Sequence, residues 1–305
     1  MRELPIRLDG DPGIAGSLLL PAGTGPFPAV LIASGSGPLD RDSNHRRARF
    51  DVARQLAQAL ADAGLASLRY DKRGVGESTG DWRAAGLHDN VDDLGTALAT
   101  LAAHPEIDAD RLLLAGHSEG ALLAAALAAR GAAVRGVVLL SVSATPGEEL
   151  LRWQARRIAP TLPTPVRGLL RLLRVDLEKK IAANHARVKR TTTDVARIGG
   201  AKINARWTRE FMAHDPRADL AAISVPVLAV TGEKDLQVPP DDLEVVATTV
   251  GGPVCVDRVP DLTHTLRTQP GAPSLGAYRK ELRRPVNHDV LRTVTHWCRE
   301  VVGLG

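Results

Sequence analysis

The 305-residue sequence has two cysteines, 3% aromatic residues and no long apolar run. Cys255 and Cys298 form no CxxC pair and no Cys/His cluster, so nothing indicates a metal site or an oxidising compartment. Both lie in apolar segments and are expected in the core. No run approaches the roughly 18–20 apolar residues that span a bilayer, and residues 1–10 lack a secretory leader pattern. We therefore expect a soluble, cytoplasmic protein without stable membrane insertion.

Positive charge is concentrated in one segment. The formal net charge is +4, but residues 146–219 hold 16 Lys and Arg against 8 Asp and Glu. Nucleic-acid binding is not expected, because aromatic residues are few and no recognition motif accompanies the charge. Two interpretations remain: a solvated helical face, or a surface that attracts anionic substrates or a membrane surface.

Short apolar runs bounded by Gly or Pro alternate with segments of helical spacing. Runs of this kind predict strands that are buried on both faces. Their alternation with helices predicts a mostly parallel central sheet with helices on both faces, an α/β fold. The last helix is expected to be capped by Asn287. The predicted strands cover residues 16–21, 28–33, 66–70, 111–115, 136–140, 226–230 and 253–256, and the predicted helices cover 46–64, 89–103, 121–130 and 287–302.

The alternation is interrupted between residues 146 and 219. This segment is basic and helical in pattern, with Pro160, Pro163 and Pro165 and no strand candidate. We interpret it as a helical cap inserted into a single domain formed by residues 1–145 and 220–305. A cap of this charge could screen substrates electrostatically. Its candidate residues for that role are Arg152, Arg156, Arg157, Arg171 and Arg174.

The pattern G-x-S-x-G occurs twice, at Gly116–Gly120 and at Gly76–Gly80. A nucleophile elbow requires a buried strand that runs directly into a tight turn, followed at once by a helix. Ser118 has an apolar strand before it and an Ala/Leu-rich helix after it, whereas Ser78 has polar neighbours on both sides. Ser118 is therefore the predicted nucleophile and Ser78 a loop residue. His117, next to Ser118, is expected to point away from the catalytic face.

A serine nucleophile needs a histidine base and a carboxylate that orients it, and in this fold they follow in the order Ser, acid, His. Asp235 lies in the loop after the strand at 226–230, with Glu233 as the alternative. His264 follows the last strand in a loop and is the predicted base. Two later histidines, His288 and His296, are expected to be structural because they belong to the last helix.

Stabilisation of the tetrahedral intermediate requires two backbone N–H groups aimed at the developing oxyanion. One is expected from Glu119, at the start of the helix that follows the elbow. The other is expected from Ser36, in a loop where Gly35 and Gly37 allow the backbone to approach a ligand closely.

Two further motifs resemble a known family. Residues 35–42, GSGPLDRD, resemble its GSGPxDRDG signature, and residues 70–78, YDKRGVGES, resemble its YDKRGxGxS block. With GHSEG at 116–120, the chain resembles bacterial serine esterases of the α/β-hydrolase superfamily, which are related to the catalytic domains of acylaminoacyl- and prolyl-peptidases. Ser43 stands where the family usually has Gly. The resemblance implies an α/β-hydrolase fold and hydrolysis of carboxylic esters through an acyl-enzyme, without metal or cofactor.

We therefore expect a serine carboxylesterase that acts on a small-molecule acyl ester. Thioesterase, lactonase, acyltransferase and peptidase-like activities would use the same triad and remain alternatives. Peptidase activity is less expected, because the related peptidases carry a large propeller domain before the hydrolase domain. A non-catalytic binding protein of the same fold is also less expected, because such proteins usually lose a triad residue or the oxyanion glycines. The acyl chain, the alcohol and the oligomeric state do not follow from the sequence.

Overall fold

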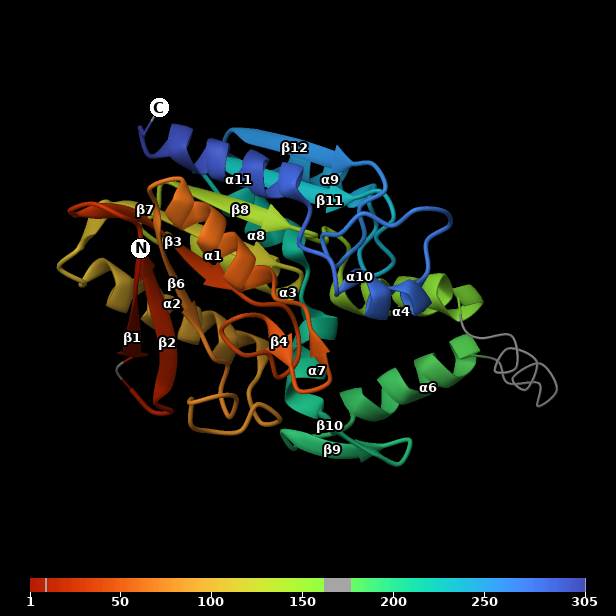
Figure 1. Cartoon of the computed structure of the whole chain (residues 1–305). Helices are drawn as coiled ribbons and strands as arrows, with labels where there is room; N and C mark the ends of the chain where they lie inside the picture. The colour runs from red at the N-terminus through yellow and green to blue at the C-terminus, as the bar shows by residue number, and fades with distance from the viewer. Residues whose placement is uncertain (9, 162–176, 305) are drawn as a thin grey trace.

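One eight-stranded sheet runs through the computed structural model, which describes residues 1–8, 10–161 and 177–304 (Figure 1). The strand order is β1-β2-β6-β3-β7-β8-β11-β12. β2 is antiparallel to β1 and β6, and the other neighbours are parallel. The predicted mostly parallel sheet is thus confirmed. Its strands are β1 (Arg2–Leu8), β2 (Ile14–Leu20), β3 (Phe27–Ala33), β6 (Ala66–Tyr70), β7 (Ile107–His117), β8 (Gly136–Leu140), β11 (Val227–Gly232) and β12 (Val254–Val259).

Helices cover both faces of the sheet. α1 (Val52–Asp62) and α11 (His288–Val301) pack on one face, in front of the strands in Figure 1. The Asn287 side chain accepts hydrogen bonds from the N–H groups at the start of α11, as predicted. No described helix is long and apolar enough to cross a bilayer. The other face is covered by α2 (Leu87–Ala102), α3 (Glu119–Ala129), α8 (Pro216–Ala222) and α9 (Asp242–Thr249).

The central strand β7 shows why its sequence is continuously apolar. Successive side chains of a strand point to opposite faces. Leu112 and Leu114 join the core beneath α2 and α3, whereas Leu113 and Ala115 join the core beneath α1 and α11. Because both faces are buried, β7 has no polar alternation in its second half.

The helix predicted to start at residue 46 begins later. Residues 44–49 instead form a small hairpin, β4 (Asn44–His45) and β5 (Ala48–Arg49), and α1 starts at Val52. Asp51 has a left-handed backbone with φ of 57°, and its N–H donates to the Asn44 side chain at 2.9 Å. Side-chain hydrogen bonding of this kind competes with helix formation, and apolar spacing does not reveal it.

The two edges of the sheet differ from what the sequence indicates, one by a strand that was not predicted and the other by a failed prediction. The first strand, β1, lacks a strong apolar signal because its partly buried Leu4 and Ile6 alternate with exposed residues. At the opposite edge, Cys255 is exposed on β12, so the prediction that it belongs to the core is wrong. Cys298 is buried, as predicted. Edge strands have fewer covering neighbours, so their apolar residues need not be enclosed.

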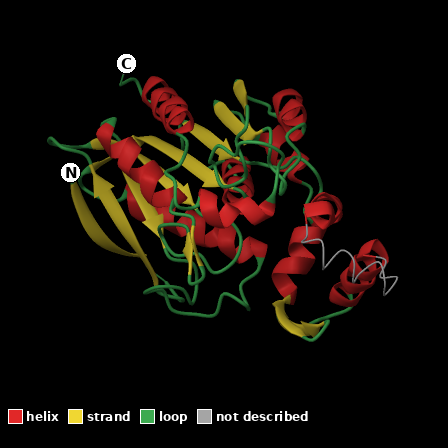
Figure 2. Cartoon of the chain, turned by 45° about the vertical axis from the view of Figure 1, so that its right-hand side comes forward, coloured by secondary structure: helices red, strands yellow, loops and turns green. Residues whose placement is uncertain are grey.

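The segment between β8 and α8 packs beside the main body of the fold (Figures 1 and 2). It contains the hairpin β9–β10, so the prediction that this segment has no strand is wrong. Gly199 and Gly200, both with positive φ, form the tight turn that joins the two strands. Pro163, Pro165, Arg171 and Arg174 lie outside the described residues. The described elements are α4 (Gly147–Ile158), a 3₁₀ turn (Ala159–Thr161), α6 (Leu177–Lys189), β9 (Val195–Ile198), β10 (Ala201–Asn204) and α7 (Ala205–Ala213).

Two glycines allow β7, α3 and β3 to approach closely at the elbow. A Cβ atom on Gly116 would lie 2.0 Å from the Gly120 carbonyl oxygen, and one on Gly120 would lie 2.1 Å from the Ala33 carbonyl oxygen. Both obstacles are backbone atoms, which cannot move aside as a flexible side chain can. The small residues around Ser118 are therefore required by packing.

We predict that Gly120→Ala lowers the free energy of unfolding by roughly 1–3 kcal/mol or more, because the added methyl group overpacks the elbow. Gly95→Ala is the matched control. Gly95 lies within α2, and its added Cβ would make an ordinary contact, 3.5 Å from the Cδ1 atom of Leu127 in α3. Helix propensity favours Ala over Gly by about 1 kcal/mol. Urea denaturation measures both variants. Equal stability of the two would contradict the packing argument.

Candidate functional site

Ser118 lies at the turn between β7 and α3. Its backbone is strained, with φ of 58° and ψ of −121°, a region that non-glycine residues rarely adopt and that is common at functional sites. The Ser118 N–H donates to the Leu140 carbonyl at 2.8 Å, which ties the turn to β8. The strand before the turn is buried, and α3 is buried over most of its length. The local structure is a nucleophile elbow.

Three predicted residues meet at this turn. The His264 Nε2 atom lies 2.9 Å from the Ser118 Oγ atom, and its Nδ1 atom lies 2.8 Å from the Asp235 Oδ2 atom. The other carboxylate oxygen of Asp235 accepts the N–H groups of Gln237 at 2.7 Å and Val238 at 3.0 Å. Because a carboxylate accepts, it favours the tautomer with the proton on Nδ1. The Nε2 atom is then free to receive the serine proton.

The other candidates lie elsewhere. Glu233 and His288 are exposed, and His296 is exposed on α11, where it contacts Glu300. Ser78 is buried in the loop after β6, where its Oγ atom donates to the Asp71 carbonyl at 2.7 Å and accepts the Ala15 N–H at 2.9 Å. The Ser78 hydroxyl is therefore engaged in hydrogen bonds that hold the loop. None of these four residues makes a hydrogen bond with the Ser118 hydroxyl among the described contacts.

Buried polar residues hold the loop that carries His264. The Glu281 carboxylate accepts the hydroxyl groups of Thr263 at 2.9 Å and Thr265 at 3.2 Å. Arg267 is 1% exposed and donates to the carbonyls of Phe50 and Thr265, each at 2.6 Å. Burial lowers the pKa of Arg267 to about 10. The loop is thereby anchored on both sides of the histidine.

His117 also positions this loop, a role that the sequence did not reveal. Its Nε2 atom lies 2.8 Å from the His264 carbonyl oxygen, and the two ring centroids are 5.0 Å apart. A carbonyl only accepts, so Nε2 carries the proton. Burial, reinforced by repulsion from His264, lowers the pKa of His117 to about 3. His117 is therefore neutral and supports the backbone of His264.

The loop after β3 lies against Ser118. A Cβ atom on Gly35 would lie 3.4 Å from the Ser118 Cβ atom. Ser36, Ser118 and Glu119 line one cavity of about 140 Å³. Glu119 is the first residue of α3, where backbone N–H groups have no partner within the helix. Ser43 has φ of 66°, which explains the usual glycine there, and its hydroxyl is 2.8 Å from that of Ser34.

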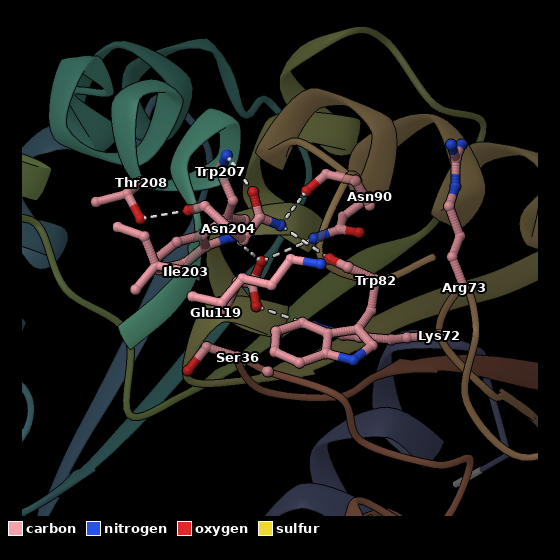
Figure 3. A pocket seen from close by; sticks show the side chains of 13 residues that line it. Ser36, Lys72, Arg73, Trp82, Asn90, Glu119, Ile203, Asn204, Trp207 and Thr208 are labelled. Carbon is pink, nitrogen blue, oxygen red and sulfur yellow. Dashed lines mark hydrogen bonds and ion pairs between the residues drawn. The ribbon is translucent and has the colours of Figure 1, made fainter. Parts of the chain in front are cut away.

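The Glu119 side chain forms a second feature that the sequence did not reveal. Its carboxylate accepts from Lys72 Nζ at 2.9 Å, Asn90 Nδ2 at 3.0 Å and Trp207 Nε1 at 2.7 Å (Figure 3). The same Lys72 ammonium donates to the Gly35 carbonyl at 2.6 Å. A carboxylate in an otherwise apolar helix needs such partners. The single charged residue in the apolar sequence of α3 was therefore the feature that could have indicated a buried ion pair.

Two neighbouring cavities share Ser36 and Glu119. The cavity at Ser118 is lined partly by apolar side chains, which include Leu122, Leu150 and Phe211. The adjoining cavity of about 320 Å³ is bordered by Trp82 and Trp207 (Figure 3). Within the described part of the chain, no group of three or more His, Cys, Asp or Glu residues could hold a metal ion.

Residues 48–270 match the family model described as serine aminopeptidase, S33. The chain belongs to this family. It is also 27% identical over 288 residues to esterase EstD of Thermotoga maritima, an alignment that covers 93% of this chain and 65% of EstD. The chain thus spans somewhat less than two thirds of that relative's length.

Solved structures show the same fold. Est1E from Butyrivibrio proteoclasticus matches with a TM-score of 0.64 and 18% identity, over 98% of this chain and 99% of that chain. The α/β hydrolase GrgF from Penicillium sp. sh18 matches with a TM-score of 0.65 and 17% identity, over 99% and 100%. The protein therefore has the α/β-hydrolase fold, as the sequence predicted.

Lys72→Met should lower the free energy of unfolding by about 3–5 kcal/mol, because it leaves the buried Glu119 carboxylate without its cation. The double variant Lys72→Met/Glu119→Gln removes both charges and should lose less stability than the sum of the two single variants. Urea denaturation of the four proteins measures this coupling. Additive losses would show that the ion pair does not act as a unit.

The pKa of His117 predicts a pH effect on stability. Between pH 3 and 6.5 the unfolded chain binds a proton at His117 that the folded chain does not. The free energy of unfolding therefore decreases as pH falls below 6.5. One proton gives a slope of about 1.4 kcal/mol per pH unit. We expect His117→Gln, whose amide can still donate to the His264 carbonyl, to lose stability less steeply than the wild type. Urea denaturation from pH 7 to 4.5 tests this, and parallel curves would refute it.

Proposed function

We propose that this protein is a serine carboxylesterase that hydrolyses small-molecule esters through an acyl-enzyme on Ser118. The observation that carries the proposal is the hydrogen-bonded chain from the Ser118 hydroxyl through His264 to Asp235, at 2.9 and 2.8 Å. The position of Ser118 on a strained turn, beside a cavity lined by both apolar and polar side chains, supports the same activity.

In the first half-reaction, the Ser118 Oγ atom attacks the ester carbonyl carbon while His264 Nε2 takes its proton. Asp235 stabilises the resulting imidazolium. The N–H groups of Ser36 and Glu119 hold the oxyanion. The intermediate collapses, the C–O bond to the alcohol breaks, and His264 returns the proton to the departing oxygen. A water molecule then attacks the acyl-enzyme by the same route, which releases the acid and restores Ser118. These steps need no metal or cofactor.

The family also suggests aminopeptidase activity, and the charges near the site favour the ester. An aminopeptidase has to bind the ammonium group of its substrate, for which a free carboxylate is suited. Among the described residues that line the two cavities at Ser36, Glu119 is the one acidic side chain, and it is paired with Lys72. The cavity with Trp82 also has Arg73 and Lys202 in its wall. The likeness to EstD, an esterase, agrees with this choice.

We also propose that the segment from α4 to α7 forms the cap of the site. Leu150 and Gln154 of α4, and Trp207 and Phe211 of α7, line the cavity that contains Ser118. Cytoplasmic location belongs to the same proposal and agrees with two cysteines that form no disulfide.

Ser118→Ala should reduce kcat for 4-nitrophenyl butyrate by at least about 10⁴-fold, because the nucleophile is absent. Ser78→Ala is the matched control from the second G-x-S-x-G motif. It should keep the activity and lose roughly 1–3 kcal/mol of stability, because the buried Ala15 N–H loses its acceptor. A fluorophosphonate probe should label the wild type and Ser78→Ala, and leave Ser118→Ala unlabelled.

Two results would refute the proposal. The first is hydrolysis by Ser118→Ala at the wild-type rate. The second is faster cleavage of alanine 4-nitroanilide than of the ester by the wild-type protein, which would make the protein an aminopeptidase.

A further inference from the structure

A basic cavity lies next to the proposed active site. It has a volume of about 590 Å³, and its lining includes His45, Arg46 and Arg47 from the β4–β5 hairpin and Arg83 from the loop after β6. None of the described residues that line it carries a carboxylate. Three guanidinium groups around one hollow are suited to an anion, because arginine binds carboxylate and phosphate oxygens through paired N–H groups.

These arginines lack an anionic partner within the described part of the chain. Neighbouring arginines are different: Arg41 pairs with Asp71 and Glu77, and Arg69 pairs with Asp42 and Glu3. Asp81, close to Arg83 in sequence, accepts its backbone N–H at 2.9 Å. The positive charge of Arg46, Arg47 and Arg83 is therefore available to a ligand.

Trp82 connects this basic cavity to the proposed active site. The Arg83 guanidinium carbon lies 4.6 Å from the centroid of the Trp82 ring, a cation–π contact that holds it against the indole. Trp82 also lines the 320 Å³ cavity that contains Ser36 (Figure 3), and Ser36 lines the cavity of Ser118. Three neighbouring cavities that share lining residues thus lie between Ser118 and the three arginines.

The distance between the two ends suits a small molecule. Ser36 borders the cavity of Ser118, and Pro38 borders the basic cavity. Two residues of extended chain span at most ~7 Å. The two cavities are therefore close enough for one small molecule to reach both.

In the segment 146–219, which the sequence suggested as the source of electrostatic selection, part of the described positive charge is paired. Glu148 pairs with both Arg152 and Lys189. Arg206 pairs with Asp89 and Glu210. The unpaired arginines that border an adjoining cavity belong to the hydrolase core.

We propose that the cavity lined by Arg46, Arg47 and Arg83 binds an anionic group of the substrate, a carboxylate or a phosphate, at the end remote from the ester. The part of the substrate between that anion and the ester lies along Trp82 and Trp207. The inference rests on the proposed esterase function and specifies its substrate class.

Two matched pairs of substrates test the proposal. Mono-4-nitrophenyl adipate and its methyl ester differ by a charge on the acyl side, and 4-acetoxyphenyl phosphate and phenyl acetate differ by a charge on the alcohol side. The readout is the ratio of kcat/KM for the anionic substrate to that for its neutral partner. In at least one pair, the variant R46Q/R47Q/R83Q should lower this ratio by about tenfold or more. Added salt should lower the wild-type ratio for that pair more than the variant ratio.

The control variant R152Q/R156Q/R157Q removes three exposed arginines from α4 and should leave the ratio unchanged. If R46Q/R47Q/R83Q is poorly soluble, the single variant Arg46→Gln should also lower the ratio, to a smaller extent. The inference would be overturned if R46Q/R47Q/R83Q left the ratio unchanged for both pairs, or if only R152Q/R156Q/R157Q lowered the ratio. Either result would leave the esterase function intact. Failure of the wild type to hydrolyse any of the four esters would instead refute the proposed function.

Discussion

The carboxylate of Glu119 is buried where four parts of the chain meet: the loop after β3, the loop after β6, helix α2 and the cap helix α7. Lys72 links it to the Gly35 carbonyl, Asn90 extends from α2, and Trp207 extends from α7. A buried charge is costly unless its partners stay in place. The arrangement that keeps Glu119 paired therefore also fixes Gly35, beside Ser36, relative to Ser118. Because Trp207 donates to the same carboxylate, a displacement of α7 would also disturb the loop that contains Gly35 and Ser36.

The strand–turn–helix around Ser118 and its proximity to Asp235 and His264 could be predicted, because local sequence and chain order specify them. The glycines at 116 and 120 are required where backbones nearly touch, and chain order limited the acid and the base to a few loop residues. Features that depend on distant partners could not be predicted in this way. His117 contacts a carbonyl 147 residues away, and Lys72 and Glu119 are 47 residues apart. The late start of α1 depends on a hydrogen bond between Asn44 and Asp51, which apolar periodicity does not detect.

A count of charged residues in the sequence identified the basic segment at 146–219. It did not identify which arginines lack a carboxylate partner. A count treats each arginine alike, whereas the structure separates those held by carboxylates from those that face a cavity alone. Arg206 and Arg46 contribute equally to net charge, but Arg206 is shared between Asp89 and Glu210. An ion pair has a weak field at the distance of a substrate, because its two charges largely cancel. Electrostatic attraction at the proposed active site should therefore come from the arginines that border an adjoining cavity, Arg46, Arg47 and Arg83, rather than from a paired residue such as Arg206.

Location on the hairpin has a further consequence for specificity. β4 and β5 contain two residues each, and their position depends on hydrogen bonds at their base, such as those from the N–H groups of Asn44 and Asp51 to neighbouring side chains. The groups proposed to carry out the reaction lie at the end of a central strand and on loops with buried anchors. Arg46 and Arg47 are exposed on the surface of this hairpin. A substitution at either position can therefore alter which substrate is held without disturbing Ser118, His264 or Asp235, and the chemistry and the selection of substrate are physically separable in this fold.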